Sequence, residues 1–171
     1  MVDVRPALAA DAVAIAAINV RAWNWAYRGV LPDAMLAGMD VGSSVQKWTR
    51  IIEDGDLELP LVAVIDGRIR GYVHQGASRD EDADSSVGEV TALYIDESCV
   101  GTGVGRALWE AALNLLRERG FGSFTVWVLD SNERGRAFYE RVGLELDGIE
   151  KLEGRGSVSI RGLRYRGSLT N

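Results

Sequence analysis

The sequence has almost none of the side chains that form disulfides or bind transition metals. It contains one cysteine, Cys99, and one histidine, His74. A single cysteine cannot form a disulfide within the chain, and this set cannot supply a Cys-rich or His-based zinc site. Neither a second histidine nor a suitably placed acid is present to activate Cys99 as a nucleophile. We therefore expect no metal site and no covalent catalysis.

The sequence also lacks a positive balance of charge and any long apolar run. Its 19 Lys and Arg residues stand against 25 Asp and Glu residues, which gives a net charge of −6. A nucleic-acid-binding domain usually carries a basic face, so we expect no nucleic acid as a partner. The N-terminal segment has no apolar run of signal-peptide length, and no stretch approaches the length of a membrane span. We expect a cytoplasmic protein with no membrane partner.

What the sequence does contain is the composition of an ordinary globular domain. Hydrophobic residues make up 47% of the chain and charged residues 26%, which argues against disorder. A length of 171 residues is enough to bury a hydrophobic core, and we expect one domain over residues 1–171. A homodimer is compatible with these properties, which do not determine the oligomeric state.

Hydrophobic periodicity predicts a chain that mixes hairpins with one strand–helix–strand crossover. The Asp66-Gly67 pair between two apolar runs is a strong hairpin signal. The predicted elements are strands at 2–5, 61–65, 68–75, 88–95, 123–129, 144–149 and 157–166, and helices at 9–23, 31–52 (broken near Gly42 and Ser43), 106–119 and 131–142. This order predicts an α/β fold of the α+β mixed-sheet type, because its alternation is too irregular for a doubly wound sheet.

Three glycines at alternate positions, Gly101, Gly103 and Gly105, join a predicted strand to a predicted helix. Glycine lets the backbone take positive φ and approach a ligand closely, and the first N–H groups of a helix lack partners within the helix. These features favour a diphosphate site over a purely structural turn. The P-loop consensus is absent, and the third glycine of a dinucleotide fingerprint would fall on Arg106 or Leu108.

This segment resembles the signature of the GNAT superfamily of N-acetyltransferases. In that signature, a strand with Leu-x-Val near its end is followed by a short turn and by Arg/Gln-x-x-Gly-x-Gly/Ala at the start of a helix. The corresponding residues are Leu93-Tyr94-Ile95 and Val100-Gly101-Thr102-Gly103-Val104-Gly105. A second motif follows in the family's order, as Asn132, Phe138-Tyr139 and Gly143-Leu144. The element order also matches, so the resemblance covers nearly the whole chain.

The resemblance implies a GNAT-like three-layer sandwich of about seven strands with helices on both faces, and acetyl-CoA as co-substrate. One position departs from the family, because Val100 stands where Arg or Gln is usual. Backbone N–H groups supply much of the diphosphate contact in the family, so the departure bears on affinity and leaves the fold unaffected. The implied cofactor-binding residues are Leu93, Tyr94, Ile95, Val100, Gly101, Thr102, Gly103, Val104, Gly105, Arg106, Asn132, Arg134 and Phe138.

An amine must be neutral when it attacks a thioester. A lysine-like amine has a pKa of about 10.4, so a base must take its proton at neutral pH. Glu89 is the candidate, because it shares strand parity with Leu93 and Ile95 and the family often carries a base at this spacing. An exposed glutamate on a strand edge is the alternative. Backbone N–H groups near Leu93 and Tyr94 would stabilise the oxyanion if a bulge splays this strand from its neighbour.

Tyr139 matches the family's general-acid position. A phenol with a pKa near 10 stays protonated at pH 7 and can protonate the leaving thiolate. The alternative is a core tyrosine, with Phe138 packed inward beside it. Asn132 either caps the following helix or binds the pantetheine amide, and the two roles can coexist. Arg106 and Arg134 are expected near the cofactor tail.

The sequence does not identify the amine acceptor. Trp23 and Tyr27 are candidate substrate-binding residues, because the first two helices of the family line the acceptor pocket and aromatic rings can hold a cation. Packing in a helix core is the alternative for both. The acidic segment 80–84 could attract cationic amines, although most charge runs are simply solvated.

Three functions are therefore open. The first is transfer of an acetyl group from acetyl-CoA to a primary amine. The second is a catalytically silent acyl-CoA-binding or regulatory module on the same fold. The third is a nucleotide-dependent oxidoreductase, which the glycine spacing and the early run of hairpin strands oppose.

Overall fold

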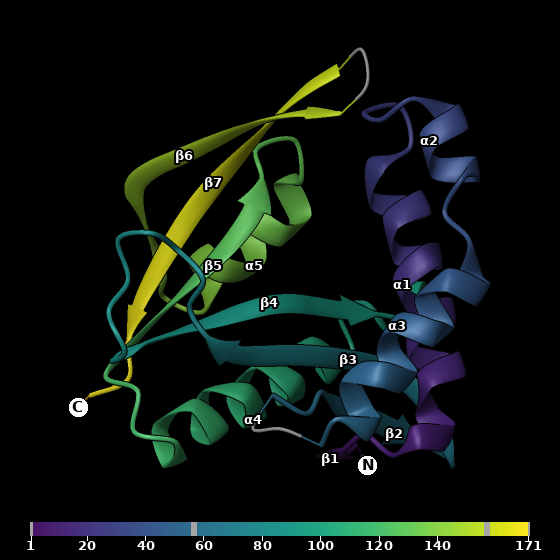
Figure 1. The fold of residues 1–171 in the computed structure, drawn as a ribbon, viewed down its shortest axis with the longest axis horizontal. Coiled ribbons are helices and arrows are strands. Elements are labelled where there is room, and N and C mark those ends of the chain that lie inside the picture. Colours follow the sequence, from purple (N-terminus) through teal and green to yellow (C-terminus); the bar gives the residue numbers. More distant parts are fainter. Residues whose placement is uncertain (1, 56–57, 156–157, 171) are drawn as a thin grey trace.

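The computed structural model describes residues 2–55, 58–155 and 158–170 (Figure 1). The strands are β1 (Asp3–Pro6), β2 (Leu61–Ile65), β3 (Arg68–Ala77), β4 (Val87–Ile95), β5 (Ser123–Leu129), β6 (Glu145–Arg155) and β7 (Val158–Ser168). The helices are α1 (Ala12–Tyr27), α2 (Asp33–Ala37), α3 (Val41–Glu53), α4 (Val104–Glu118) and α5 (Glu133–Arg141), with single 3-10 turns at η1 (Ala9–Asp11) and η2 (Glu97–Cys99).

In the described part of the chain, seven strands form one mixed sheet in the order β1-β2-β3-β4-β5-β7-β6. Strands β4 and β5 pair in parallel, and the other neighbours pair antiparallel. Parallel neighbours need a crossover, which α4 supplies between β4 and β5. The predicted mixed sheet is confirmed, and so is the α/β three-layer arrangement.

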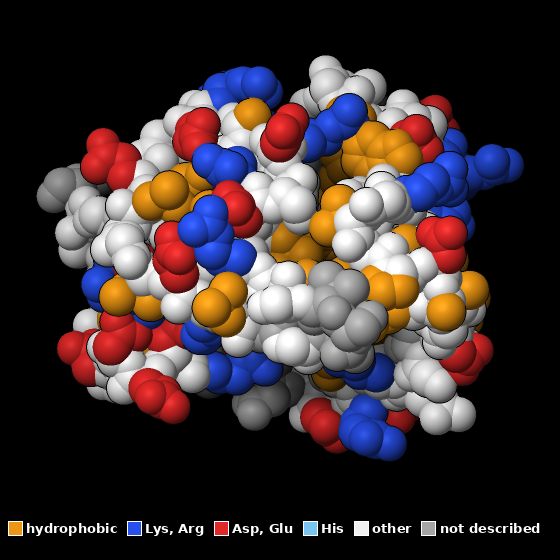
Figure 2. Space-filling view, turned by 90° about the horizontal axis from the view of Figure 1, so that it is seen from above, with side chains coloured by type: hydrophobic (Ala, Val, Ile, Leu, Met, Phe, Trp, Pro, Cys, Tyr) orange, Lys and Arg blue, Asp and Glu red, His pale blue; other side chains and the backbone are white. Residues whose placement is uncertain are grey.

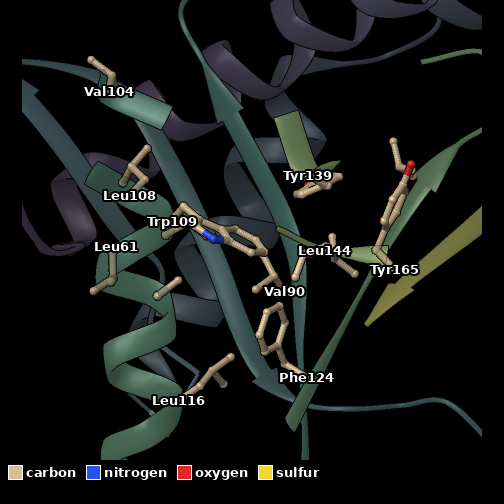
Figure 3. Packing of buried hydrophobic residues seen from close by; sticks show 14 of the residues in the cluster. Leu61, Val90, Val104, Leu108, Trp109, Leu116, Phe124, Tyr139, Leu144 and Tyr165 are labelled. Carbon is tan, nitrogen blue, oxygen red and sulfur yellow. The ribbon is translucent and has the colours of Figure 1, made fainter. Parts of the chain in front are cut away.

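Helices cover both faces of the sheet. Helices α1 and α3 pack on one face, where Ile15, Ile18 and Trp48 are buried with Val62 and Tyr72 of the sheet. Helices α4 and α5 lie on the other face, where a second hydrophobic cluster is centred on Trp109 of α4 (Figures 1 and 3).

The second cluster is rich in aromatic rings. The ring of Trp109 lies 5.5 Å from those of Phe124 and Tyr139 and 5.9 Å from that of Phe138, measured between centroids. Such edge-on and tilted contacts add to the free energy of burial, by about 0.5–1.5 kcal/mol for a pair. Figure 3 shows Trp109 reaching across from α4 toward Tyr139. The packing fixes α5 against α4, which matters because both helices border the cavity described below.

Several predicted boundaries differ from the structure. The break predicted near Gly42 and Ser43 exists but lies at residues 38–40, because the Asp40 carboxylate accepts hydrogen bonds from the amides of Gly42 and Ser43 and caps α3 there. Helix α4 begins at Val104 instead of residue 106, which places Gly105 in its first turn. Strands β6 and β7 run further than predicted, and residue 157, where the last predicted strand began, lies outside the described residues.

One extra residue interrupts the pairing of β4 with β3. The register shifts between His74 and Gln75, and Thr91 is the residue of β4 left over. A bulge of this kind bends its strand and increases the local twist. It lies next to the point where β4 and β5 part.

Strands β4 and β5 stay paired only as far as Val90 and Val126. Both strands continue beyond that pair, β4 to Ile95 and β5 to Leu129. The ribbon shows them diverging, with β4 running toward α1 and β5 toward the loop before α5 (Figure 1). The sheet is therefore split along one edge of β4.

The acidic segment after β3 is held by a buried arginine. Arg164 of β7 is 3% exposed and bonds Asp82 at 2.6 and 2.7 Å, Asp80 at 3.1 Å and Asp147 at 2.7 Å. Asp80 also accepts from the Trp127 indole and from Lys151. Burial alone would raise the pKa of Asp80, but these bonds hold it below its usual range. Asp80 and Asp82 are therefore structural ion-pair partners.

We expect Arg164→Met to lower the free energy of unfolding by about 3 kcal/mol, because it removes a buried cation shared by Asp80, Asp82 and Asp147 and leaves the half-exposed Lys151 as the cation paired with buried Asp80. Urea titration at pH 7 measures the change. Arg161→Met is the matched control: its guanidinium lies 2.6 Å from Asp130 on the surface, and such pairs are worth less than about 1 kcal/mol. Equal losses in the two variants would contradict a structural role for the network.

The loss of stability in Arg164→Met should depend on pH. Hydrogen bonding to Arg164 lowers the pKa of Asp82 to about 2 from its ordinary value of 3.8. A carboxylate whose pKa is lower in the folded than in the unfolded protein stabilises the folded state at pH values above its unfolded pKa. That stabilisation is lost as the pH falls toward the folded pKa. The difference in free energy of unfolding between wild type and Arg164→Met should therefore become smaller as the pH is lowered from 4 to 2.

Candidate functional site

A cavity of about 940 Å³ occupies the split between β4 and β5. Helices α1, α4 and α5 complete its walls. Seen from above, the molecule is hollowed near the middle of this face, and hydrophobic side chains are visible inside the hollow (Figure 2). The predicted site residues that line this larger cavity are Tyr27, Leu93, Tyr94, Ile95, Val100, Gly101, Gly103, Gly105, Arg106, Asn132, Arg134, Phe138 and Tyr139.

A smaller cavity of about 380 Å³ lies between α1, α3 and the β3–β4 surface. Trp23 lines it, whereas Tyr27, the other predicted substrate-binding residue, lines the larger cavity. Both cavities are bordered by Thr91, Ala92 and Tyr94 of β4. The two cavities therefore border the same stretch of β4, beside the bulge.

The glycine turn forms one end of the larger cavity. Gly101 and Gly103 have φ values of 78° and 91°, in the left-handed region that favours glycine. The first hydrogen bond of α4 runs from the amide of Ala107 to the Gly103 carbonyl, so the amides that precede Ala107 in the helix lack helical partners. Unpaired amides at a helix start form a site for a phosphate group.

Two predicted cofactor residues of this turn do not line the cavity with their side chains. Val104 is completely buried in the hydrophobic core. The Thr102 hydroxyl donates to the Cys99 carbonyl at 2.7 Å and holds the turn instead. At these two positions only the backbone is left to contact a ligand.

Tyr139 is a buried lining residue of the larger cavity. Its side chain is 7% exposed, and its hydroxyl has no hydrogen-bond partner among the described residues. Burial raises the pKa of Tyr139, so the phenol stays protonated at neutral pH. A free, protonated hydroxyl is available to donate to a ligand.

The start of α5 carries two further cofactor candidates. Asn132 caps the helix, since its Oδ1 accepts from the Gly135 amide at 3.0 Å. The Arg134 guanidinium lies 4.2 Å from the centroid of the Trp25 ring, and both side chains line the larger cavity. This cation–π contact joins α1 to α5 across the cavity. Trp25 was not singled out from the sequence as a site residue.

Glu89 lies outside the linings of both cavities. It is 8% exposed, and its Oε2 accepts from the Arg79 amide at 3.1 Å. The expected strand parity is wrong, because the bulge at Thr91 reverses the alternation and places Val90, not Glu89, on the side of Leu93. Arg79, whose amide donates to this carboxylate, lines the smaller cavity.

His74 is a lining residue of the smaller cavity that sequence reasoning did not place there. Its Nδ1 lies 2.6 Å from the Thr91 hydroxyl, and its buried Nε2 makes no hydrogen bond of good geometry, although the Glu58 main chain lies near. Burial is the largest cause that lowers the pKa of His74; Glu58 opposes the shift, and the charges of Arg79 and Lys47 add to it. The imidazole is therefore neutral at pH 7. A lone histidine on a strand carries no spacing signal that could have revealed this.

The sequence and the fold both match known proteins. A family model described as the acetyltransferase (GNAT) family matches residues 19–144. The uncharacterised N-acetyltransferase YuaI of Bacillus subtilis is 31% identical over 133 residues, which are 77% of this chain and 74% of that protein. The chain belongs to the GNAT acetyltransferase family.

Two further likenesses support this GNAT assignment. The mycothiol acetyltransferase of Saccharomonospora viridis is 29% identical over 139 residues, which are 79% of this chain but only 42% of that enzyme. The structure of yncA from Salmonella typhimurium, solved with its cofactor acetyl-CoA, superimposes with a TM-score of 0.72 at 20% identity and covers 100% of this chain and 95% of the other. No helix in the described residues is long and apolar enough to cross a membrane.

We expect Gly103→Val to weaken acetyl-CoA binding by about 10-fold or more, because valine is strained at this φ and would crowd the amides of the turn. Isothermal titration calorimetry measures the affinity. Gly120→Val is the matched control, since Gly120 has a similar φ of 86° at the other end of α4, away from both cavities. An unchanged dissociation constant for Gly103→Val would place the diphosphate elsewhere.

Proposed function

We propose that this chain transfers the acetyl group of acetyl-CoA directly to a primary amine of a separate acceptor molecule. The observation that carries the proposal is that Thr91, Ala92 and Tyr94 line both cavities. Acetyl-CoA in the larger cavity would bring its thioester to this point, and an amine in the smaller cavity would reach the same carbonyl carbon. We also propose that the chain is a single domain and a cytoplasmic protein.

The diphosphate of acetyl-CoA would lie at the start of α4. The backbone amides of Gly103, Val104 and Gly105 supply donors there that do not depend on side chains, which accounts for a site built with Val100 in place of Arg or Gln. Arg106 and Arg134 add positive charge at the same cavity. The pantetheine chain would then follow the split between β4 and β5 toward Tyr139.

The oxyanion formed by the attack needs a donor that the sheet does not already use. The amide of Asp96 donates to the Arg70 carbonyl of β3 at 2.7 Å. Alternation along an antiparallel pair then directs the amide of Tyr94 toward β3 and that of Leu93 toward β5. Because β4 and β5 have separated by this point, the Leu93 amide is the candidate oxyanion donor.

Removal of the amine proton is assigned to Glu89 acting through water. The carboxylate accepts from the amide of Arg79, a lining residue of the smaller cavity, but does not itself line either cavity, which supports relayed transfer more than direct contact. As the tetrahedral intermediate collapses, the carbon–sulfur bond breaks and the thiolate of CoA takes the proton of the Tyr139 hydroxyl. The acetylated amine and free CoA are the products.

A catalytically silent acyl-CoA-binding module is the alternative on the same fold. The two functions differ in one measurement, the release of free CoA when acetyl-CoA is supplied with a panel of primary amines. Amine-dependent release of CoA would support the transferase. Tight binding of acetyl-CoA without release for any amine would favour the silent module.

We expect Tyr139→Phe to lower kcat by about 100-fold or more, the usual scale of general acid catalysis, while acetyl-CoA binding changes little. Steady-state kinetics and calorimetry measure the two effects. Tyr165→Phe is the control: Tyr165 packs against Tyr139, but its hydroxyl donates to Glu140 at 2.9 Å. A donor with a more acidic leaving thiol should reduce the Tyr139→Phe defect. A kcat of Tyr139→Phe close to that of the wild type would show that Tyr139 only packs in the core and is not the general acid.

We expect Glu89→Gln to lower kcat by about 10- to 100-fold at neutral pH without weakening acetyl-CoA binding, because the amide cannot accept the proton. The defect should shrink as pH approaches the pKa of the amine, about 10.4 for a lysine-like acceptor. A pH–rate profile of both proteins measures this. Glu118→Gln on the exposed side of α4 is the control. A defect of constant size across the profile would remove Glu89 from the proton transfer.

A further inference from the structure

The smaller cavity carries positive charge and no carboxylate. Among the described residues that line it, Lys47 and Arg79 are the charged side chains, and His74 is neutral. Neither cation forms an ion pair within the described ranges. Both line the cavity together with His74, and their charges add to the lowering of its pKa, of which burial is the largest cause.

The nearby acids are already engaged. Asp80 and Asp82 are bonded to Arg164, and the Glu89 carboxylate accepts from a backbone amide. Glu58, the remaining acid close to His74, accepts from the Ala77 amide at 3.3 Å and is not a lining residue. The excess positive charge at the cavity is therefore not balanced by an acid that lines it.

The rest of the wall is apolar and aromatic. It includes Trp23, Trp48, Tyr72, Tyr94, Met35 and Met39. A volume of about 380 Å³ is at the lower end of small-molecule sites, which suits an acceptor of amino-acid size more than a polymer. Unpaired cations at the edge of such a wall complement an anion attached to an apolar body.

We propose that the acceptor is a small primary amine that also carries an anionic group, with Lys47 and Arg79 binding the anion and the aromatic wall binding its apolar part. The inference rests on the proposed acetyl transfer. It predicts that an α-amino acid with an apolar side chain, or its phosphonate counterpart, is a better acceptor than polyamines and other polycationic amines.

The experiment compares acceptors that differ only in the anion. L-Methionine and L-phenylalanine are each assayed beside their amides and their decarboxylated amines, with an aminoalkylphosphonate and spermidine as further arms. The amide has the more acidic ammonium group and hence more neutral amine at pH 7, so a preference for the acid opposes intrinsic reactivity. We expect kcat/KM to be at least about 10-fold higher for the acid, the scale of one charge-assisted hydrogen bond.

Two variants assign the preference to residues. Lys47→Ala and Arg79→Ala should each lower the ratio of kcat/KM for acid over amide by about 10-fold, and Arg79→Glu should reverse the preference. Arg68→Ala, at the opposite end of β3 from Arg79, is the matched control and should leave the ratio unchanged. Reporting a ratio separates loss of anion binding from any general effect on folding.

Calorimetry with acetyl-CoA separates the two proposals. A wild-type chain that does not bind acetyl-CoA overturns the acetyl transfer itself. A chain that binds acetyl-CoA, yet acetylates amides, decarboxylated amines or spermidine as well as the acids, overturns only the anionic acceptor. The anionic acceptor is also overturned if the Lys47 and Arg79 variants leave the ratio of kcat/KM for acid over amide unchanged. It is overturned as well if no carboxylated or phosphonated amine is acetylated.

Discussion

The architecture of the site depends on one failure of strand pairing. Parallel strands β4 and β5 hold together as far as Val90 and Val126 and then part, next to the extra residue Thr91. Separating two strands exposes backbone groups that would otherwise be paired, and such groups are costly unless a ligand or water satisfies them. In this fold the separated strands border the larger cavity, where a ligand can reach the unpaired edge of β4.

The surrounding structure holds that split open. On one side the cluster around Trp109 fixes α5 beside α4, and the cation–π contact of Arg134 with Trp25 joins α5 to α1. On the other side Arg164 draws the segment after β3 onto β7, through bonds to Asp80 and Asp82. Both arrangements use contacts between residues far apart in sequence, so the geometry of the split is a property of the whole sheet.

The sequence predicted those features whose physical cause is local. The glycines at 101 and 103 indicated a left-handed turn before a helix, and Asn132 indicated a cap, because φ preferences and side chain–amide bonds act over a few residues. The bulge at Thr91 was not predictable, since register is set between strands, and it invalidated the parity argument for Glu89. In the acidic segment Glu81, Asp82 and Asp84 are exposed, as expected of a charge run, but the burial of Asp80 was not predicted, because its partner Arg164 lies 84 residues away.

The shared border formed by Thr91, Ala92 and Tyr94 has a kinetic consequence. Two reactants that enter separate cavities do not compete for space, so both can be present before any bond is broken. A ternary complex of this kind gives intersecting lines in double-reciprocal plots, whereas a covalent acyl-enzyme gives parallel ones. It also means that one molecule combining CoA with a tethered acceptor could span both cavities, and would bind with the advantage of effective concentration over its two halves.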